Sequence, residues 1–206
     1  MRLHPNMNTL MNMHVAPRDL TDTETRIINA AIEVILKFGP RKTTMNDIAE
    51  AAGLTRQTVY VSFGGKENVL AETVRFIGKR HMSQVSVAWE YCANLTEKLQ
   101  AYARIVVLDA YDEMTGEDDP QVLVSNHNEA ERAAYQEVCE QHAAMRAEQL
   151  APCAEKLERA GTTANRLAQL IVSTSLNLKK TEGDKGKLHE QLSVLNASVL
   201  SMAGRR

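Results

Sequence analysis

The stretch IAEAAGLTRQTVYVSF, residues 48–63, decides the fold of this 206-residue chain. It places a small residue, Ala49, four positions before Gly53, and follows the glycine with the apolar Leu54 and Val59. Two helices that cross through a short turn need a small residue where they touch and a residue that tolerates a left-handed backbone where they turn. Leu54 and Val59 are spaced to seal the second helix onto the first. This is the spacing of a DNA-binding helix-turn-helix.

The residues around this stretch predict further helices. Residues 23–38 carry apolar side chains on one helical stripe, with Thr21 and Glu24 placed as a capping box at the start. Gly39-Pro40 predicts the end of that helix. Two short helices are expected over residues 45–52 and 56–62. The first of them has Thr44 and Asp47 as its caps, and a longer fourth helix begins near Lys66.

The run from Thr43 to Leu70 resembles the signature of the TetR family of transcriptional regulators. That signature is close to T-T-x-x-x-I-A-x-x-A-G-[apolar]-[ST]-x-x-x-[apolar]-Y-x-x-F-x-x-K-[DE]-x-[apolar]-L, and every specified position is filled. Ser62 departs from it, since a histidine is common just before the phenylalanine. The resemblance covers residues 24–75. It implies an all-α fold: a three-helix helix-turn-helix head, joined by a long fourth helix to a helical ligand-binding and dimerisation body.

Composition agrees with an all-helical globular protein, at 44% hydrophobic and 24% charged residues. The net charge is −2, but Lys and Arg outnumber Asp and Glu over residues 24–80, and the acids are in excess over residues 81–206. A mildly basic head on an acidic body fits sequence-specific DNA binding. Three widely spaced cysteines form no disulfide framework or metal motif and predict a cytoplasmic protein.

Several functions are not expected from the sequence. No apolar run approaches the ~18–20 residues of a membrane span, and the N-terminus lacks the apolar core of a signal peptide. No nucleophile elbow, phosphate loop or metal-helix motif occurs, so no enzyme activity, cofactor or metal site is expected. The predicted domains are a disordered arm (1–20), the helix-turn-helix domain (21–66) and the ligand-binding and dimerisation body (67–206).

The outward side chains of the third helix predict contacts with DNA. Arg and Gln are the side chains able to read guanine and adenine edges bidentately. Tyr60 and Lys66 resemble the family's backbone-contacting pair, and Lys66 stands at a helix N-terminus, where amides favour phosphate. The alternative is a merely solvated helix face. The predicted DNA-binding residues are Thr44, Thr55, Arg56, Gln57, Thr58, Tyr60 and Lys66.

The body is expected to contain helices over residues 95–114, from about 120 to 159 with a break near Ala151-Pro152, and over 163–180 and 185–203. The resemblance implies a pocket enclosed by the fourth to eighth helices. The candidate ligand-binding residues are Trp89, Tyr102, Asp109, Tyr111, Tyr135 and His142. Aromatic residues at helical spacing equally fit an ordinary core, and Asp109 equally fits a position facing solvent.

The two final helices predict a four-helix interface between two copies of the chain. The predicted dimerisation residues are Leu167, Ile171, Ser175, Leu188, Leu192, Leu195 and Val199. Packing within one chain is the alternative. The expected partners are a palindromic double-stranded operator, an unknown small-molecule effector and a second copy of the chain. The expected function is a dimeric repressor released by its effector. An activator, a ligand-independent regulator and a protein–protein adaptor are the alternatives.

Overall fold

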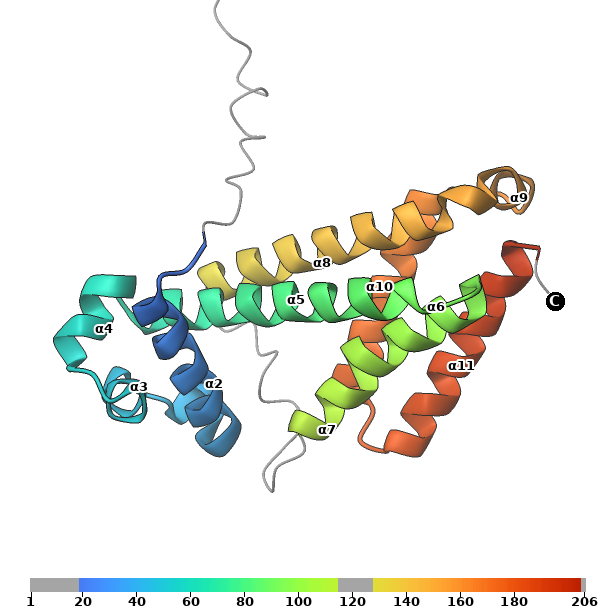
Figure 1. Ribbon diagram of the computed structural model, residues 1–206. Coiled ribbons are helices and arrows are strands. Elements are labelled where there is room, and N and C mark those ends of the chain that lie inside the picture. Colours follow the sequence, from blue (N-terminus) through green and yellow to red (C-terminus); the bar gives the residue numbers. More distant parts are fainter. Residues whose placement is uncertain (1–18, 115–127, 205–206) are drawn as a thin grey trace, which may run out of the picture.

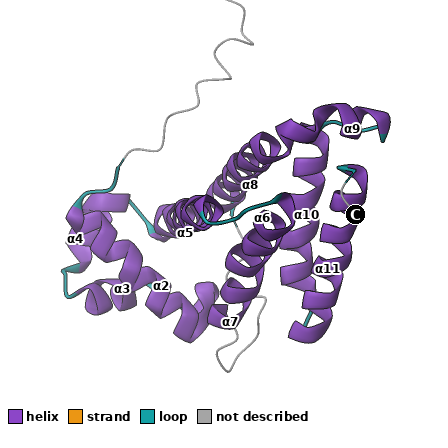
Figure 2. Cartoon of the chain, turned by 45° about the vertical axis from the view of Figure 1, so that its right-hand side comes forward, coloured by secondary structure: helices purple, strands orange, loops and turns teal. Residues whose placement is uncertain are grey.

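The computed structural model describes residues 19–114 and 128–204, and every regular element within these two ranges is helical (Figures 1 and 2). The all-α prediction is therefore confirmed. Residues 1–18 of the predicted arm, and the predicted polar break at residues 115–120, lie outside the described ranges.

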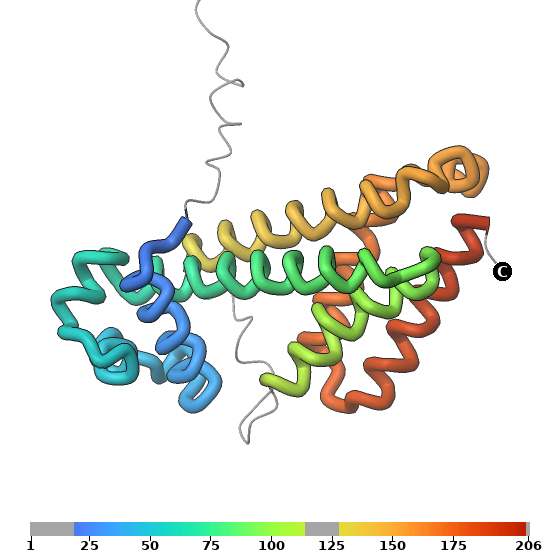
Figure 3. The backbone as a smooth tube through the Cα atoms, in the orientation of Figure 1, coloured from blue at the N-terminus to red at the C-terminus, as the bar shows by residue number. Residues whose placement is uncertain are grey.

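The head comprises α2 (Asp22–Lys42), α3 (Met45–Ala52) and α4 (Arg56–Phe63), and α5 (Lys66–Glu90) leads from it into the body. The body continues with α6 (Leu95–Tyr102), the π-helix η1 (Ala103–Asp109), α7 (Ala110–Met114), α8 (Glu129–Leu150), the 3-10 turn η3 (Ala151–Cys153), α9 (Ala154–Arg159), α10 (Ala164–Thr181) and α11 (Lys185–Met202). The head lies at one end of the molecule, and α5 and α8 run side by side away from it (Figure 1). The described chain ends at the opposite end of the body from the head (Figure 3).

The predicted caps of the head helices are present. Thr21 and Glu24 form a capping box at the start of α2, and Thr44 and Asp47 form another at the start of α3. Each box satisfies backbone N–H groups that have no partner inside the helix. Gly39 breaks α2 as expected, with a φ of 78°, but one further turn follows it up to Lys42.

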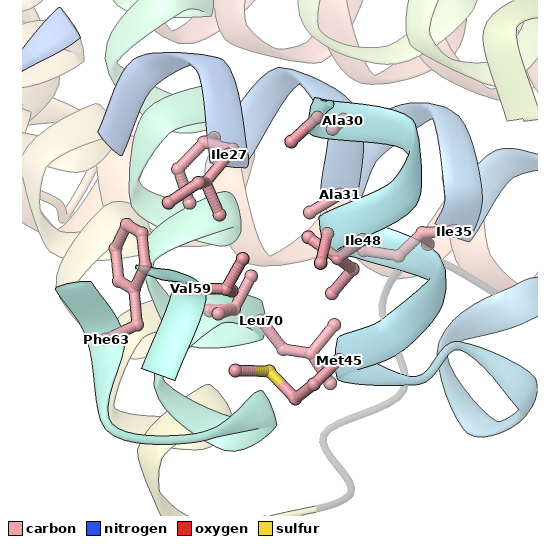
Figure 4. Close-up of a cluster of buried hydrophobic side chains, with 13 residues drawn as sticks. Ile27, Ala30, Ala31, Ile35, Met45, Ile48, Val59, Phe63 and Leu70 are labelled. Atoms are coloured by element: carbon pink, nitrogen blue, oxygen red, sulfur yellow. The ribbon is translucent and has the colours of Figure 1, made fainter. Parts of the chain in front are cut away.

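Side chains from α2, α3, α4 and the first turn of α5 converge in a single apolar core in the head (Figure 4). Ile27 and Ile48 are fully buried there, and Val59 of α4 packs against them. Val69 and Leu70 of α5 belong to the same core. The head core therefore includes the start of the connecting helix, so the predicted domain boundary at residues 66–67 stays a prediction.

The helix predicted over residues 95–114 is continuous but changes type in its middle. The π-helix η1 replaces α-helical geometry between Ala103 and Asp109. Leu99, Tyr102 and Val106 of the predicted stripe are buried, and the stripe continues at Ala110 and Tyr111. Asp109 is exposed. This agrees with the alternative of a position facing solvent, and Asp109 is not among the residues that line the cavity between head and body.

The residues predicted for dimerisation pack within the single chain, which is the alternative that the sequence left open. The residues already buried within the single chain are Leu167, Ile171, Ser175, Leu188, Leu192 and Val199. Leu195 is half-buried against the same core. Buried side chains have almost no surface left for a second chain, so these stripes fill the chain's own core. The outward faces carry other apolar residues, with Leu170 55% and Val194 68% exposed.

Helices α5 and α8 approach each other closely at a glycine. A Cβ at Gly78 of α5 would lie 2.6 Å from a γ-carbon of Val138 on α8. Valine is stiff at χ1 and has few ways to move aside. The absence of a side chain at Gly78 therefore sets the spacing of the two helices.

We expect Gly78→Ala and Val138→Ala to show energetic coupling in urea unfolding. Gly78→Ala overpacks the contact, which costs about 1–3 kcal/mol, against a helix-propensity gain of about 1 kcal/mol. Val138→Ala alone leaves a cavity. In the double variant the new methyl group occupies the vacated space, so the two free-energy changes should fail to add by at least about 0.5 kcal/mol. Strict additivity would contradict the close contact.

Candidate functional site

The second helix of the predicted motif is held onto the first by the geometry of the turn between them. Gly53 takes the left-handed conformation, with φ 61° and ψ 38°. The Leu54 amide donates a 2.9 Å hydrogen bond to the carbonyl of Ala49. A Cβ at Gly53 would lie 2.8 Å from a guanidinium nitrogen of Arg26, which itself donates to the Gly53 carbonyl. The turn therefore requires glycine for its left-handed backbone, whereas the flexible Arg26 side chain could move away from a Cβ.

Helix α4 presents polar side chains away from the head core. Thr55 caps it, and its hydroxyl accepts a 3.1 Å hydrogen bond from the amide of Thr58. Arg56 and Gln57 are exposed. The Arg56 guanidinium lies 5.3 Å from the centroid of the Tyr60 ring and donates to its hydroxyl. These side chains form one solvent-facing surface with the chemistry needed for base and phosphate contacts.

The start of α5 lies next to the end of α2. Lys66 donates a 3.1 Å hydrogen bond from Nζ to the carbonyl of Arg41. Gly65, the N-cap of α5, supplies no side-chain cap. The first amides of this 25-residue helix therefore have no side-chain acceptor at the cap, which suits a phosphate oxygen. Arg41 and Lys42 add exposed cations at the end of α2.

The sequence analysis missed one residue of the α4 surface. Val61 is 80% exposed, the largest exposure among the bulky apolar side chains of the head. The pattern placed the apolar residues of α4 in the core, and Val59 does lie there. An exposed apolar side chain on this helix suits contact with a thymine methyl group.

A cavity of about 100 Å³ lies where the head meets the body. Its lining comes from α2 of the head and from α5, η1, α7, α8 and α10 of the body. Apolar walls are supplied by Ile32, Leu36, Val74, Ile77, Val106, Ala110, Val138 and Leu176. Polar groups are supplied by Arg80, His81, Glu113, Glu131, Tyr135, His142 and Lys179.

The buried basic groups of this region are perturbed by loss of water. Burial lowers the pKa of His81 to about 3, and Lys179 and His142 add repulsion. Burial also lowers the pKa of His142 to about 4, although a hydrogen bond to the backbone of Gly78 acts in the opposite direction. The pKa of Lys179 falls to about 8, again mainly through burial. At neutral pH both histidines are therefore uncharged, and Lys179 is mostly protonated.

A second set of polar groups lies behind the cavity. The Tyr102 hydroxyl and His142 Nδ1 are 3.0 Å apart. The Arg146 guanidinium lies over the face of the Tyr102 ring, 4.3 Å from its centroid. Burial lowers the pKa of Arg146 to about 10, which still leaves it charged at neutral pH.

Only part of the predicted ligand set reaches the cavity. Tyr135 and His142 line it. Tyr102 supports His142 from behind, and Tyr111 is buried in the body core. Trp89 donates from Nε1 to the carbonyl of Lys98, 3.0 Å away, and packs against the same core. For Trp89 and Tyr111 the alternative of an ordinary core position is the one that the structure supports.

Lys179 and His81 are not among the predicted ligand residues, most of which are aromatic. Lys179 precedes a second lysine at the end of a helix, a position typical of solvated cations. Yet it follows Ser175 by four residues and Leu176 by three, so it continues the buried stripe of α10. That spacing is a usable signal for a buried lysine.

The described helices include none that is both long and apolar enough to cross a membrane. Within the same residues, no group of three or more His, Cys, Asp and Glu side chains is arranged to hold a metal ion.

The N-terminal part of the chain matches known regulators. A sequence model described as "Bacterial regulatory proteins, tetR family" matches residues 27–73. The HTH-type transcriptional regulator SrpR of Pseudomonas putida is 47% identical over 49 residues, which make up 24% of this chain and 23% of SrpR. The aligned stretch thus spans less than a quarter of that relative's length.

Solved structures match almost the whole chain. The fatty acid degradation regulator FadR from Bacillus halodurans superposes with a TM-score of 0.67 at 19% identity, covering 89% of this chain and 97% of FadR. The transcriptional regulator FadR from Bacillus subtilis, in complex with stearoyl-CoA, gives 0.59 at 21% identity, covering 87% and 96%. At these identities the likeness shows the fold alone.

The helix-turn-helix head and the helical body together give the chain the fold of TetR-family regulators. Residues 27–73, which form most of the DNA-binding head and the start of α5, are therefore those of a TetR-family transcriptional regulator.

The buried histidines predict a loss of stability in mild acid. Their pKa values in the folded chain, about 3 for His81 and about 4 for His142, lie below the value of 6.5 for an exposed histidine. The unfolded chain therefore binds protons first as the pH falls below 6.5. Each histidine should lower the free energy of unfolding by about 1.4 kcal/mol per pH unit until its folded pKa is reached.

Urea unfolding between pH 7 and pH 5 measures this slope. His81→Gln should remove about half of the part of this slope that the two buried histidines cause. His189 is exposed, so His189→Gln should leave the slope unchanged. Equal slopes for wild type and His81→Gln would contradict a buried, neutral His81.

Proposed function

We propose that this chain is a cytoplasmic, dimeric repressor whose affinity for its operator is controlled by a small molecule in the cavity between head and body. The single observation that carries the proposal is the lining of that cavity. Ile32 and Leu36 belong to α2 of the DNA-binding head, and they share one cavity with side chains of α5, α8 and α10. An occupant of this cavity contacts the head directly.

The likeness to the FadR of Bacillus subtilis supports a small-molecule effector, because that regulator of the same fold was solved with stearoyl-CoA. The coupling also has a physical route. A ligand changes an equilibrium only by binding one conformation better than the other. A cavity with walls on both head and body changes shape when the two move relative to each other, so its occupant has different contacts in the two arrangements.

A mobility-shift assay tests this function, using DNA from the region upstream of the chain's own gene against random DNA of equal length. We expect specific binding that a cognate effector reverses. Specific binding that no small molecule weakens would favour a ligand-independent regulator. Absence of any specific binding would favour an adaptor.

The proposed DNA surface separates residues that position the head from those that read bases. Lys66→Ala should weaken binding to operator and random DNA by similar factors, because a phosphate contact carries no sequence information. A dimer loses two such contacts, so the slope of log K against log salt should flatten by about 1.8.

Arg56→Ala and Gln57→Ala serve as the matched comparison on the same surface. If either side chain reads a base, its loss should cost about 1–3 kcal/mol per half-site on the operator and far less on random DNA. These predictions take α4 to lie in the major groove, where base edges are read. If Lys66→Ala spares random DNA, or neither α4 variant narrows the ratio of operator to random affinity, that placement is wrong.

The proposed dimer uses the outward faces of α10 and α11. Val194→Glu would place a charge without a partner in that interface, so we expect it to shift sedimentation at micromolar concentration from dimer towards monomer. Val87→Glu is the matched control, since Val87 is 54% exposed on α5. A wild-type protein that already sediments as a monomer would overturn the proposed dimer.

A further inference from the structure

The cavity between head and body contains more hydrogen-bond donors than acceptors to satisfy them. The Lys179 ammonium has three N–H donors, and one of them is used, in a 3.3 Å hydrogen bond to the Val106 carbonyl. The buried Nε of Arg80 has no partner among the described residues. The His81 ring borders the cavity, and no hydrogen bond joins it to another described side chain or carbonyl.

The carboxylates that border the cavity are already engaged. Glu113 accepts a 3.3 Å hydrogen bond from the Arg80 guanidinium. Glu131 accepts a 2.6 Å hydrogen bond from the side-chain amide of Asn128 at the start of α8. A cationic ligand would have to compete with these partners, whereas an anion would meet donors that are not yet used.

A second observation, deeper in the body, points the same way. Arg146 is fully buried, and none of its three guanidinium nitrogens has a hydrogen-bond partner within the described chain. Its contact is with the face of the Tyr102 ring. Among the described residues of the body, the buried charged groups are thus Lys179 and Arg146 against one acid, Glu131. Since an uncompensated buried charge is costly, the interior favours the arrival of a negative charge.

We propose that the effector of this chain is an amphipathic anion, a carboxylate on an apolar chain, whose head group pairs with Lys179 and accepts hydrogen bonds from His81 and Arg80. The apolar part packs against Ile32 and Leu36 of α2 and Val74 of α5. This inference rests on the proposed function, because it takes the cavity to be the effector site.

The size of the cavity explains how such a ligand acts on the head. About 100 Å³ is well below the roughly 300–1,000 Å³ of drug-sized ligand sites. A chain of several methylene groups therefore enters by displacing lining side chains. Because α2 supplies part of that lining, the head is moved relative to the body as the ligand binds.

Isothermal titration of the full chain with three eight-carbon probes tests the ligand class. Octanoate, 1-octanol and octylamine have the same apolar chain and differ in the charge of the head group. We expect octanoate to bind at least tenfold more tightly than the other two. Equal or tighter binding of octanol or octylamine, or no binding of octanoate at millimolar concentration, would overturn the proposal.

Lys179→Met tests the proposed partner of the head group. It keeps a long side chain and removes the charge, and replacing a buried charge with an apolar group is often neutral or stabilising. We expect a loss of octanoate affinity of tenfold or more, with octanol binding unchanged. Lys180→Met, one residue along α10 at an exposed position, should change neither. Equal losses for octanoate and octanol would mean that Lys179 serves packing alone and would overturn its role.

The pH dependence provides an independent readout. Lys179 is faced by His81 and Arg80 from α5, by Glu113 from α7, and by Cys139 and His142 from α8. Its pKa of about 8 in the free protein implies that octanoate affinity falls above pH 8, by up to tenfold per pH unit, as the ammonium loses its proton. Lys179→Arg should bind octanoate without this fall. A flat profile for the wild type would overturn the pairing.

The mobility shift distinguishes failure of this inference from failure of the proposed function. Free Lys179→Met should bind the upstream DNA as the wild type does, and octanoate should release the wild type at concentrations that leave the variant bound. Operator binding without any octanoate effect would reject the anion and keep the DNA-binding regulator. Octanoate binding without operator binding would keep the anion site and reject the repressor.

Discussion

The rest of the structure depends on one unbroken helix that belongs to two cores. Val69 and Leu70 at the start of α5 lie in the head core, and Val85 near its end lies in the body core. A helix transmits displacement because its backbone hydrogen bonds fix its length and direction. The head therefore has no independent hinge at the point where α5 leaves it, and its position follows from how α5 packs on the body.

The helices α5 and α8 pack closely beside the cavity that is proposed to bind the effector. Because Gly78 has no side chain, the Val138 side chain of α8 packs directly against the backbone of α5. The same glycine lines the cavity. Helices that touch this closely repack in discrete steps, because their side chains interlock. A ligand bound in the cavity beside Gly78 can thus change the spacing of α5 and α8, and this change moves the DNA-binding surface of the head.

The interior of the body contains several buried ionisable groups. His142, Tyr102 and Arg146 are joined by direct contacts, and His142 shares the lining of the cavity with His81 and with Lys179 of α10. Buried ionisable groups destabilise a fold unless they are paired. A bound ligand that accepts hydrogen bonds from these groups would compensate the cost of burying them. The anionic effector is therefore inferred from the buried donors of the body, and DNA binding is inferred from the surface of the head.

The sequence by itself determined the head, because its features are local. A left-handed glycine, a small contact residue and capping boxes are each fixed by residues a few positions apart, so Gly53, Ala49 and the Thr44–Asp47 pair could be assigned correctly. Helix positions in the body followed from periodicity for the same reason. Tertiary structure decided which face of each helix is buried and what meets it. Asp109 faces solvent, the stripes of α10 and α11 pack in the chain's own core, and Lys179 is buried. These outcomes depend on helices distant in sequence and on a change of helical pitch, and neither is encoded in the spacing of neighbouring residues.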